Sequence, residues 1–150
     1  MKVIRLTKEF RFEMAHALWN YDGLCKNLHG HSYILSVTVI GKPLDNSNHP
    51  KFGMVMDFGE LKAIVYKEIL EPLDHSVLVY KDAPVADLKN LPQMTERFFA
   101  LDYQPTCENL LIDFASRIRS QLPRGIHLHS LKLHETSSSY AEWYASDQDE

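Results

Sequence analysis

The part of this chain best suited to chemistry is a group of three histidines and one cysteine. His16 ends the stretch FEMAH, and Cys25, His29 and His31 all lie in CKNLHGH. Imidazole nitrogens are good zinc ligands, and three of them leave the fourth tetrahedral position open to a water or a substrate oxygen. The residue types therefore indicate a candidate zinc site with one position free for chemistry.

The spacing of the histidines allows them to share one ion. His29 and His31 are two residues apart, so both side chains project from the same face of an extended backbone. His16 has the same parity as Phe12 and Met14 in an expected first strand, so a return of the chain could bring it beside the pair. The alternative is that H-x-H is only two polar residues at a strand start.

Length and composition limit what the site can belong to. The chain has 150 residues, enough for one domain with its own core, and a formal net charge of −4. Lys and Arg are scattered rather than striped, so we expect no nucleic-acid partner. Neither a signal peptide nor a run long enough to cross a bilayer is visible, and we expect a cytoplasmic protein with no membrane partner. Cys25 and Cys107 are expected to be free thiols, because that compartment is reducing.

Hydrophobic periodicity predicts strand, strand, helix, helix, strand, strand. Alternation over 2–14 and 33–39 predicts a long hairpin, with Cys25 in the connecting loop. Helical spacing follows Asp57, a plausible N-cap, and is expected to stop at Pro72. A second helix is expected to open at PTCENLL, after Pro105 and Thr106. Residues 126–135 and 140–144 then predict a closing hairpin.

Two segments do not follow this pattern. Residues 81–103 alternate neither way and hold two prolines, so we expect an inserted loop with at most a helical turn. Residues 146–150, SDQDE, are expected to form a frayed acidic tail after a single domain covering 1–145.

Six motifs in order carry a resemblance to a known family: FEMAH, CKNLHGH, GMVMDFGELK, LDH, PTCENL and HET. Together they resemble the 6-pyruvoyltetrahydropterin synthase superfamily from about Val3 to Tyr144, apart from the 81–103 segment. The C-x-x-x-H-G-H spacing is similar to the 6-carboxytetrahydropterin synthase branch, because eukaryotic pyruvoyl enzymes usually have two more residues there. FEMAH and SVLVY depart from the usual family residues, which leaves the branch more open than the superfamily.

The resemblance implies an α+β architecture called the tunnelling fold. In it a four-stranded antiparallel sheet carries two helices on one face, and three subunits join their sheets into a barrel. Two trimers usually stack, so a homohexamer with active sites at subunit interfaces is implied. Closure of the barrel removes the unpaired strand edges of each subunit, which gives this assembly a physical reason.

The resemblance also assigns roles to residues at matching positions. His16, His29 and His31 become the zinc ligands and Cys25 the general base. A zinc ion would polarise a developing carbonyl while a thiolate takes a proton from the adjacent carbon. Without the resemblance, Cys25 could be read as a small buried hydrophobe.

Four further residues take roles from the resemblance, each beside a simpler interpretation. Asp74 would orient His75, the partner of the cysteine, although such a pair could simply cap a turn. Glu135 in HET would hold the pterin ring and join the proton relay, although exposed glutamates are common. Thr106 and Glu108 would contact substrate, but a helix cap and a first-turn acid explain them equally well.

The implied reaction converts 7,8-dihydroneopterin triphosphate into 6-carboxy-5,6,7,8-tetrahydropterin, with release of triphosphate and acetaldehyde. That lyase step belongs to deazapurine synthesis, including queuosine. One alternative is 6-pyruvoyltetrahydropterin synthase, which shares the ligands and the base. Another is a non-catalytic, zinc-bearing oligomer that binds pterins. Release of a hydroxymethyl pterin is disfavoured, because family members that do so tend to replace the cysteine with glutamate.

Overall fold

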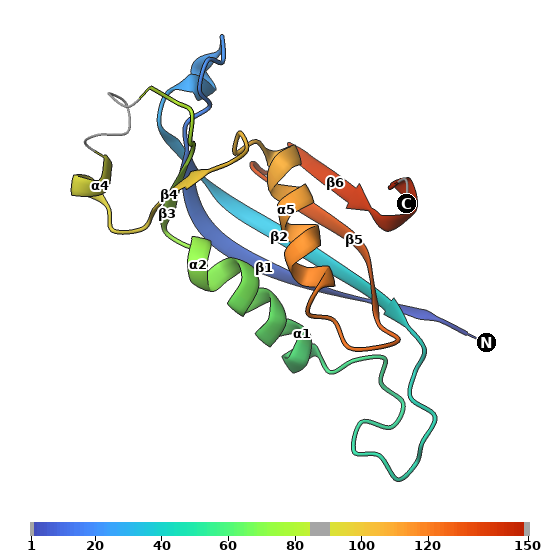
Figure 1. Cartoon of the computed structure of the whole chain (residues 1–150). Coiled ribbons are helices and arrows are strands. Elements are labelled where there is room, and N and C mark those ends of the chain that lie inside the picture. Colours follow the sequence, from blue (N-terminus) through green and yellow to red (C-terminus); the bar gives the residue numbers. More distant parts are fainter. Residues whose placement is uncertain (1, 85–90, 149–150) are drawn as a thin grey trace.

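A single curved sheet with helices over one face organises the chain (Figure 1). The computed structural model describes residues 2–84 and 91–148. Six strands pair in the order β4-β3-β1-β2-β5-β6. Their bounds are Ile4–His16 (β1), His29–Gly41 (β2), Ser76–Tyr80 (β3), Phe98–Leu101 (β4), His127–His134 (β5) and Tyr140–Tyr144 (β6).

The expectation of a four-stranded antiparallel sheet is wrong in the number of strands. The four expected strands do form a continuous antiparallel unit, β1-β2-β5-β6. However, β3 pairs in parallel with the last three residues of β1, and β4 pairs in parallel with β3. The resulting six-stranded sheet is mixed. Both extra strands are short, and β4 lies inside the segment expected to be a loop.

Two long helical segments pack on the sheet. The first comprises α1 (Phe58–Val65), a π-helical turn (Tyr66–Leu70) and α2 (Glu71–Leu73). The Asp57 side chain caps its start by accepting from the Gly59 backbone N–H at 2.7 Å, which confirms the expected N-cap. The helix ends at Leu73, one residue after Pro72, so its expected end at Pro72 is confirmed to within one residue. A helix-interior proline leaves a carbonyl without its usual partner, and the widened turn just before Pro72 accommodates the change.

The second helix, α5, covers Cys107–Arg119 and begins where the sequence predicted. Its buried residues and the inward side chains of the strands form one core, because alternate residues of each strand face the helices. On β1 the inward residues are even-numbered and end with Phe12, Met14 and His16. On β2 they are odd-numbered. The helices cover one face of the sheet (Figure 1), and the alternation along β1 and β2 places the histidines on that face.

The segment 81–103 is more regular than a loop in the part that the structure describes. It contains the short helix α4 (Leu91–Met94), which supplies the expected helical turn, and the strand β4. Residues 85–90 lie outside the described residues. At the C-terminus a 3-10 turn, η3 (Ala145–Asp147), follows β6, and residues 149–150 of the expected tail are also outside the description. Among the described helices, none combines the length and apolarity that crossing a bilayer requires.

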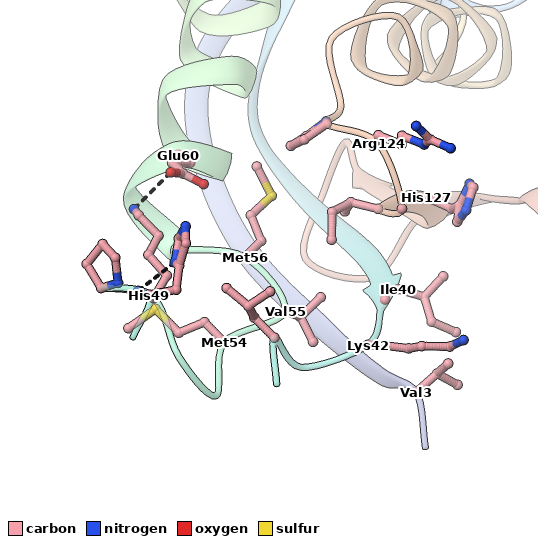
Figure 2. A pocket seen from close by; sticks show the side chains of 17 residues that line it. Val3, Ile40, Lys42, His49, Met54, Val55, Met56, Glu60, Arg124 and His127 are labelled. Atoms are coloured by element: carbon pink, nitrogen blue, oxygen red, sulfur yellow. Dashed lines mark hydrogen bonds and ion pairs between the residues drawn. The ribbon is translucent and has the colours of Figure 1, made fainter. Parts of the chain in front are cut away.

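A cavity of about 1110 Å³ lies at the end of the sheet remote from the histidines (Figure 2). Its lining includes Met54 and Met56 from the loop before α1, and Lys42 and Arg124 at its rim. This cavity opens beyond the last residue of β2, whereas His29 is the first. The two ends of that strand are roughly 40 Å apart along the backbone. None of the expected site residues lines this cavity.

Candidate active site

The register of the central hairpin brings the three histidines together. His16 pairs with His29 across β1 and β2, and Met14 pairs with His31. Side chains of directly opposed residues share a face, and His31 lies two residues from His29, so all three rings point to the helix-covered side. One ligand atom from each histidine lies within 4.8 Å of the others. The structure therefore confirms that the trio could hold a metal ion.

Two backbone carbonyls fix the tautomers of this cluster. His16 Nδ1 donates to the Pro105 carbonyl at 2.7 Å, and His29 Nδ1 donates to the Asn27 carbonyl at 2.7 Å. A carbonyl can only accept, so each neutral ring carries its proton on Nδ1 and leaves Nε2 as a lone pair. The Nε2 atoms of His16 and His29 face each other at 3.0 Å. Two lone pairs at that distance are an arrangement suited to a shared cation.

The third histidine adds a ring nitrogen without a hydrogen-bond partner. His31 Nε2 is buried and makes no hydrogen bond with the described residues. Burial is the main cause that lowers the pKa of His16 to about 4, and burial lowers the pKa of His31 as well. Both rings are therefore neutral at neutral pH, the form that binds metal. The donor set, the tautomers and the orphaned nitrogen all fit a divalent ion such as zinc.

Glu135 lies at the edge of this cluster. One carboxylate oxygen is 3.9 Å from His16 Nε2, and the side chain is 25% exposed. The residue directly follows β5, and a hydrogen bond from its backbone N–H to the Ser139 carbonyl closes the turn into β6. A carboxylate in this position can accept hydrogen bonds from a ligand that approaches the histidines.

Cys25 lies in the loop between β1 and β2, in the short 3-10 turn Leu24–Lys26. Its carbonyl accepts from the Leu18 N–H at 3.0 Å, which ties this loop to the end of β1. Both cysteines are free, as expected, but they differ in setting. Cys25 is partly exposed, whereas Cys107 is buried and its thiol donates to the Leu133 carbonyl at 3.3 Å. Burial is the main cause that raises the pKa of Cys107 to about 12.

Asp74 and His75 form a pair at the junction between α2 and β3. His75 Nδ1 is 2.9 Å from an oxygen of Asp74, and the same oxygen accepts from the Glu13 backbone N–H at 2.9 Å. His75 has a φ of 61° and a side chain that is 73% exposed. It shares a shallow cavity of about 350 Å³ with His31. Among the described residues no hydrogen bond or ion pair connects this pair to Cys25.

Thr106 and Glu108 occupy the start of α5. The Thr106 hydroxyl accepts from the Asn109 N–H at 3.2 Å, so it is an N-cap. Glu108 is exposed in the first turn, where a negative charge suits the helix dipole. Their local roles are thus structural, and a contact with substrate stays a prediction.

Sequence reasoning missed several groups around the site. Tyr33 follows His29 and His31 on the same face of β2, and its buried hydroxyl has no hydrogen-bond partner among the described residues. That parity was the available signal. The Pro105 and Asn27 carbonyls act through the backbone, which residue type does not reveal. Arg97, which contacts the Asp74 backbone, lies in the 81–103 segment, where no periodicity pointed to it.

Comparison with known families gives one match, over nearly the whole chain. The model of the family described as 6-pyruvoyl tetrahydropterin synthase matches residues 5–146. The matched range contains every candidate site residue discussed above.

Several relatives have similar sequences. A Haemophilus influenzae protein named 6-carboxy-5,6,7,8-tetrahydropterin synthase is 33% identical over 94% of this chain and 99% of its own length. An Aquifex aeolicus protein of the same name is 30% identical over 92% of this chain and 96% of its own. A Drosophila melanogaster 6-pyruvoyl tetrahydrobiopterin synthase is 34% identical over 76% of this chain and 57% of its own.

Solved structures show the same fold. An uncharacterised Wolinella succinogenes protein superposes with a TM-score of 0.79 at 22% identity, covering 97% of this chain and 99% of its own. The Caenorhabditis elegans 6-pyruvoyl tetrahydropterin synthase superposes with a TM-score of 0.67 at 23% identity, covering 97% of each chain.

Proposed function

The chain belongs to the 6-pyruvoyl tetrahydropterin synthase family, and from that premise we propose that it is a zinc-dependent 6-carboxy-5,6,7,8-tetrahydropterin synthase. In this reaction 7,8-dihydroneopterin triphosphate and one water give 6-carboxy-5,6,7,8-tetrahydropterin, triphosphate and acetaldehyde. Two relatives named 6-carboxy-5,6,7,8-tetrahydropterin synthase align with this chain over nearly their full length, which supports the carboxy branch over the pyruvoyl one. The product would enter deazapurine synthesis, including that of queuosine, in the cytoplasm.

The observation that carries the proposal is a set of three imidazole groups whose nitrogens lie within 4.8 Å of one another. Carbonyl partners leave the Nε2 atoms of His16 and His29 as acceptors, and the buried His31 Nε2 has no hydrogen-bond partner among the described residues. A zinc ion bound there would polarise the oxygens of the substrate side chain and ease loss of a proton from the adjacent carbon. His16, His29 and His31 would hold it, with one coordination position left for substrate.

Glu135 would hold the pterin ring. A carboxylate offers two acceptor oxygens, and the amino-pyrimidinone edge of a pterin presents two N–H donors at matching spacing. Its distance of 3.9 Å from His16 Nε2 would place the ring beside the histidine cluster. The substrate side chain at the 6-position could then reach the metal.

Cys25 would remove the carbon-bound proton, and His75 would return protons as triphosphate leaves. A thiolate is the form of cysteine that can act as a base, and a nearby imidazolium or metal favours it. Asp74 lies 2.9 Å from His75 Nδ1, so a proton on Nδ1 would pair with this carboxylate, and His75 Nε2 would be the atom that exchanges protons with substrate. Thr106 and Glu108, beside the carbonyl that holds His16, would contact the ring from the start of α5.

No hydrogen bond or ion pair joins Cys25 to the Asp74–His75 pair among the described residues, which supports a site completed by a second subunit. The His75 side chain is mostly exposed, and the outer edge of β1 before Glu13 has no strand partner among the described residues. Barrel closure through such edges is the assembly that this family implies. We propose a homohexamer, a dimer of trimers, in which the pair meets Cys25 of another chain.

Product analysis tests the function directly. Purified zinc-loaded protein is incubated with 7,8-dihydroneopterin triphosphate, and the pterins and acetaldehyde are measured by mass spectrometry. We expect 6-carboxytetrahydropterin and acetaldehyde in equal amounts. A pyruvoyl product without acetaldehyde would assign the chain to the pyruvoyl branch. If substrate is bound but stays unchanged, the protein is a pterin-binding oligomer and the catalytic proposal fails.

A further inference from the structure

Arg97 contacts the backbone that carries the Asp74–His75 pair. Its Nε donates to the Asp74 carbonyl at 2.8 Å, and one terminal nitrogen donates to the Glu71 carbonyl. Arg97 belongs to the described part of the 81–103 segment, which contains none of the six motifs that carry the family resemblance. A side chain from this segment thus holds a backbone that the proposed reaction needs.

The two carbonyls are ones that the helix itself leaves open. Glu71 and Asp74 lie at the C-terminal end of the first helical segment, where the last carbonyls have no N–H donor within the helix. That end also carries partial negative charge, which favours a cation. The planar guanidinium group can donate to both carbonyls at once, whereas a lysine ammonium at the end of a flexible chain has no such fixed geometry.

The main chain of Arg97 reinforces the contact. The Arg97 carbonyl accepts from the Val77 N–H at 2.8 Å, and β4 begins at the next residue and pairs with β3. The Arg97 N–H donates to the Thr95 hydroxyl at 3.2 Å. Arg97 therefore contacts the chain on both sides of His75, through its side chain at Asp74 and through its backbone carbonyl at Val77.

The contacts of Arg97 matter because of the backbone conformation of His75. With a φ of 61°, His75 adopts the left-handed conformation that residues with a Cβ rarely occupy. Such a conformation persists only where the surroundings over-determine it. Two hydrogen bonds hold the peptide group between Asp74 and His75. The His75 N–H donates to the Glu13 carbonyl, and the Asp74 carbonyl accepts from Arg97 Nε.

We propose that Arg97 is a positioning residue for the proton-transferring His75, an inference that rests on the proposed function. It acts through the Asp74 backbone and touches neither substrate nor metal. By fixing the Asp74 main chain, it keeps the Asp74 carboxylate beside His75 Nδ1, at 2.9 Å. The 81–103 segment thereby contributes to the site through Arg97, the residue that precedes β4.

Three variants separate positioning from simple stability. Arg97→Lys keeps the positive charge but loses the planar guanidinium group that donates to both carbonyls, and Arg97→Ala removes the charge as well. Arg124→Lys is the control, because it makes the same chemical change in an exposed turn at the remote end of the sheet. We expect Arg97→Lys to lower kcat roughly tenfold with KM nearly unchanged, since small misplacements of a catalytic group slow chemistry more than binding. Guanidinium ion at non-denaturing concentration should restore part of the activity of Arg97→Ala. Arg124→Lys should behave as wild type in each assay.

A second readout needs no turnover. Long-range ¹H–¹⁵N spectra of ¹⁵N-histidine-labelled protein report the tautomer of His75, with His75→Gln used for assignment. We expect the Nδ1–H form to dominate in wild type and to lose population in Arg97→Lys and Arg97→Ala. If wild type shows no turnover, the proposed function fails while this spectrum still tests Arg97. Unchanged His75 signals in both variants, or a kcat loss that thermal unfolding fully explains, would overturn the inference.

Discussion

At the scale of single residues, the chemistry depends on which nitrogens of the histidine cluster are left without protons. The Pro105 and Asn27 carbonyls hold His16 and His29 in the Nδ1–H form, so their Nε2 lone pairs meet at 3.0 Å. Two acceptors at that distance repel each other unless a cation lies between or beside them. The cluster is therefore a site of local strain in the absence of a metal, and metal binding should stabilise the fold.

Replacement of His31 tests this interpretation. We expect His31→Ala to weaken zinc binding by more than roughly a hundredfold. Loss of a residue that only hydrogen-bonds to a metal ligand costs up to about a hundredfold, so a larger loss would indicate that His31 binds the metal itself. Elemental analysis after dialysis against a weak chelator gives the metal content, and melting with and without zinc gives the coupling to stability. His127→Ala, an exposed histidine on β5, is the matched control. Equal zinc content in both variants would refute the assignment of His31 as a ligand.

The two cysteines should differ sharply in reactivity and in their effect on turnover. At pH 8 iodoacetamide should label Cys25, which is partly exposed, and spare Cys107, whose pKa burial raises to about 12. Intact-mass spectrometry resolves the two outcomes.

We expect Cys25→Ala to lower turnover by about 10²- to 10⁴-fold, the usual contribution of a general base, without a change in melting temperature. Full turnover in this variant would exclude Cys25 as the base.

Cys107 should make stability depend on alkaline pH. Its pKa rises from 9.0 in the unfolded chain to about 12 in the fold, so the folded state retains a proton that the unfolded state loses. The contribution of the thiol is fully present below pH 9 and is lost as pH rises through about 12, with a slope of at most about 1.4 kcal/mol per pH unit. Denaturant titrations of wild type and Cys107→Ala between pH 8 and 10.5 measure the difference, which should shrink with pH. Parallel curves would contradict this.

At the scale of elements, the start of α5 serves both the fold and the site. Thr106 caps the helix through its hydroxyl, and the preceding carbonyl, of Pro105, holds His16 Nδ1. A shift of the helix start therefore moves the histidine partner. This coupling explains how one short motif, PTCENL, could combine a capping role with one at the site.

Substitution of Thr106 separates these roles. We expect Thr106→Ala to lower the free energy of unfolding by about 1 kcal/mol through loss of the cap, and Thr106→Ser to retain it. Denaturant unfolding measures this cost. If Thr106 also contacts substrate, KM will rise in the alanine variant at temperatures where both variants are fully folded. An unchanged KM would leave Thr106 with the structural role alone.

The long elements could be predicted from the sequence because each has one clear period. β1, β2, β5 and β6 alternate, and α5 repeats every three to four residues, so burial on one face determined them. The histidine trio followed from the same parity. By contrast, β3 reads SVLVY, a short apolar run without alternation, as is usual for parallel strands covered on both faces.

What the sequence did not reveal depends on contacts between distant segments. β4 exists because β3 offers it an edge, and Arg97 matters because it reaches the Asp74 carbonyl. The left-handed conformation of His75 has no sequence signal, since it occurs at a histidine and not at glycine. Tertiary pairing overrides weak local preference in each of these cases.

At the scale of the whole molecule, β1 leaves one edge open. Glu13 directs both its N–H and its carbonyl away from β2, toward Asp74 and His75. In an antiparallel pair, alternate residues point their backbone groups the same way, so Arg11, Glu9 and Thr7 also present theirs outward. β3 covers only the last three residues of β1. Such a row of unpaired groups is a natural place for a strand of another subunit, with β6 as the opposite edge of the antiparallel unit.

Subunit complementation tests whether the active site crosses that interface. Cys25→Ala and His75→Ala should each be inactive alone, and each should assemble as wild type does, because both side chains are at least partly exposed. The two variants are co-expressed with different tags, and the hybrid oligomers are purified. If a site takes Cys25 from one chain and His75 from its neighbour, random mixing supplies an intact residue at each position with a chance of about one half, so about a quarter of the sites regain both groups. We therefore expect about a quarter of wild-type turnover from an equimolar hybrid, measured with the dihydroneopterin triphosphate assay. A double variant, carrying both changes in one chain and mixed with wild type, is the matched control for assembly. If Cys25 and His75 act within one chain, the hybrid of single variants stays inactive at every mixing ratio, and the shared site is excluded while the metal centre is untouched.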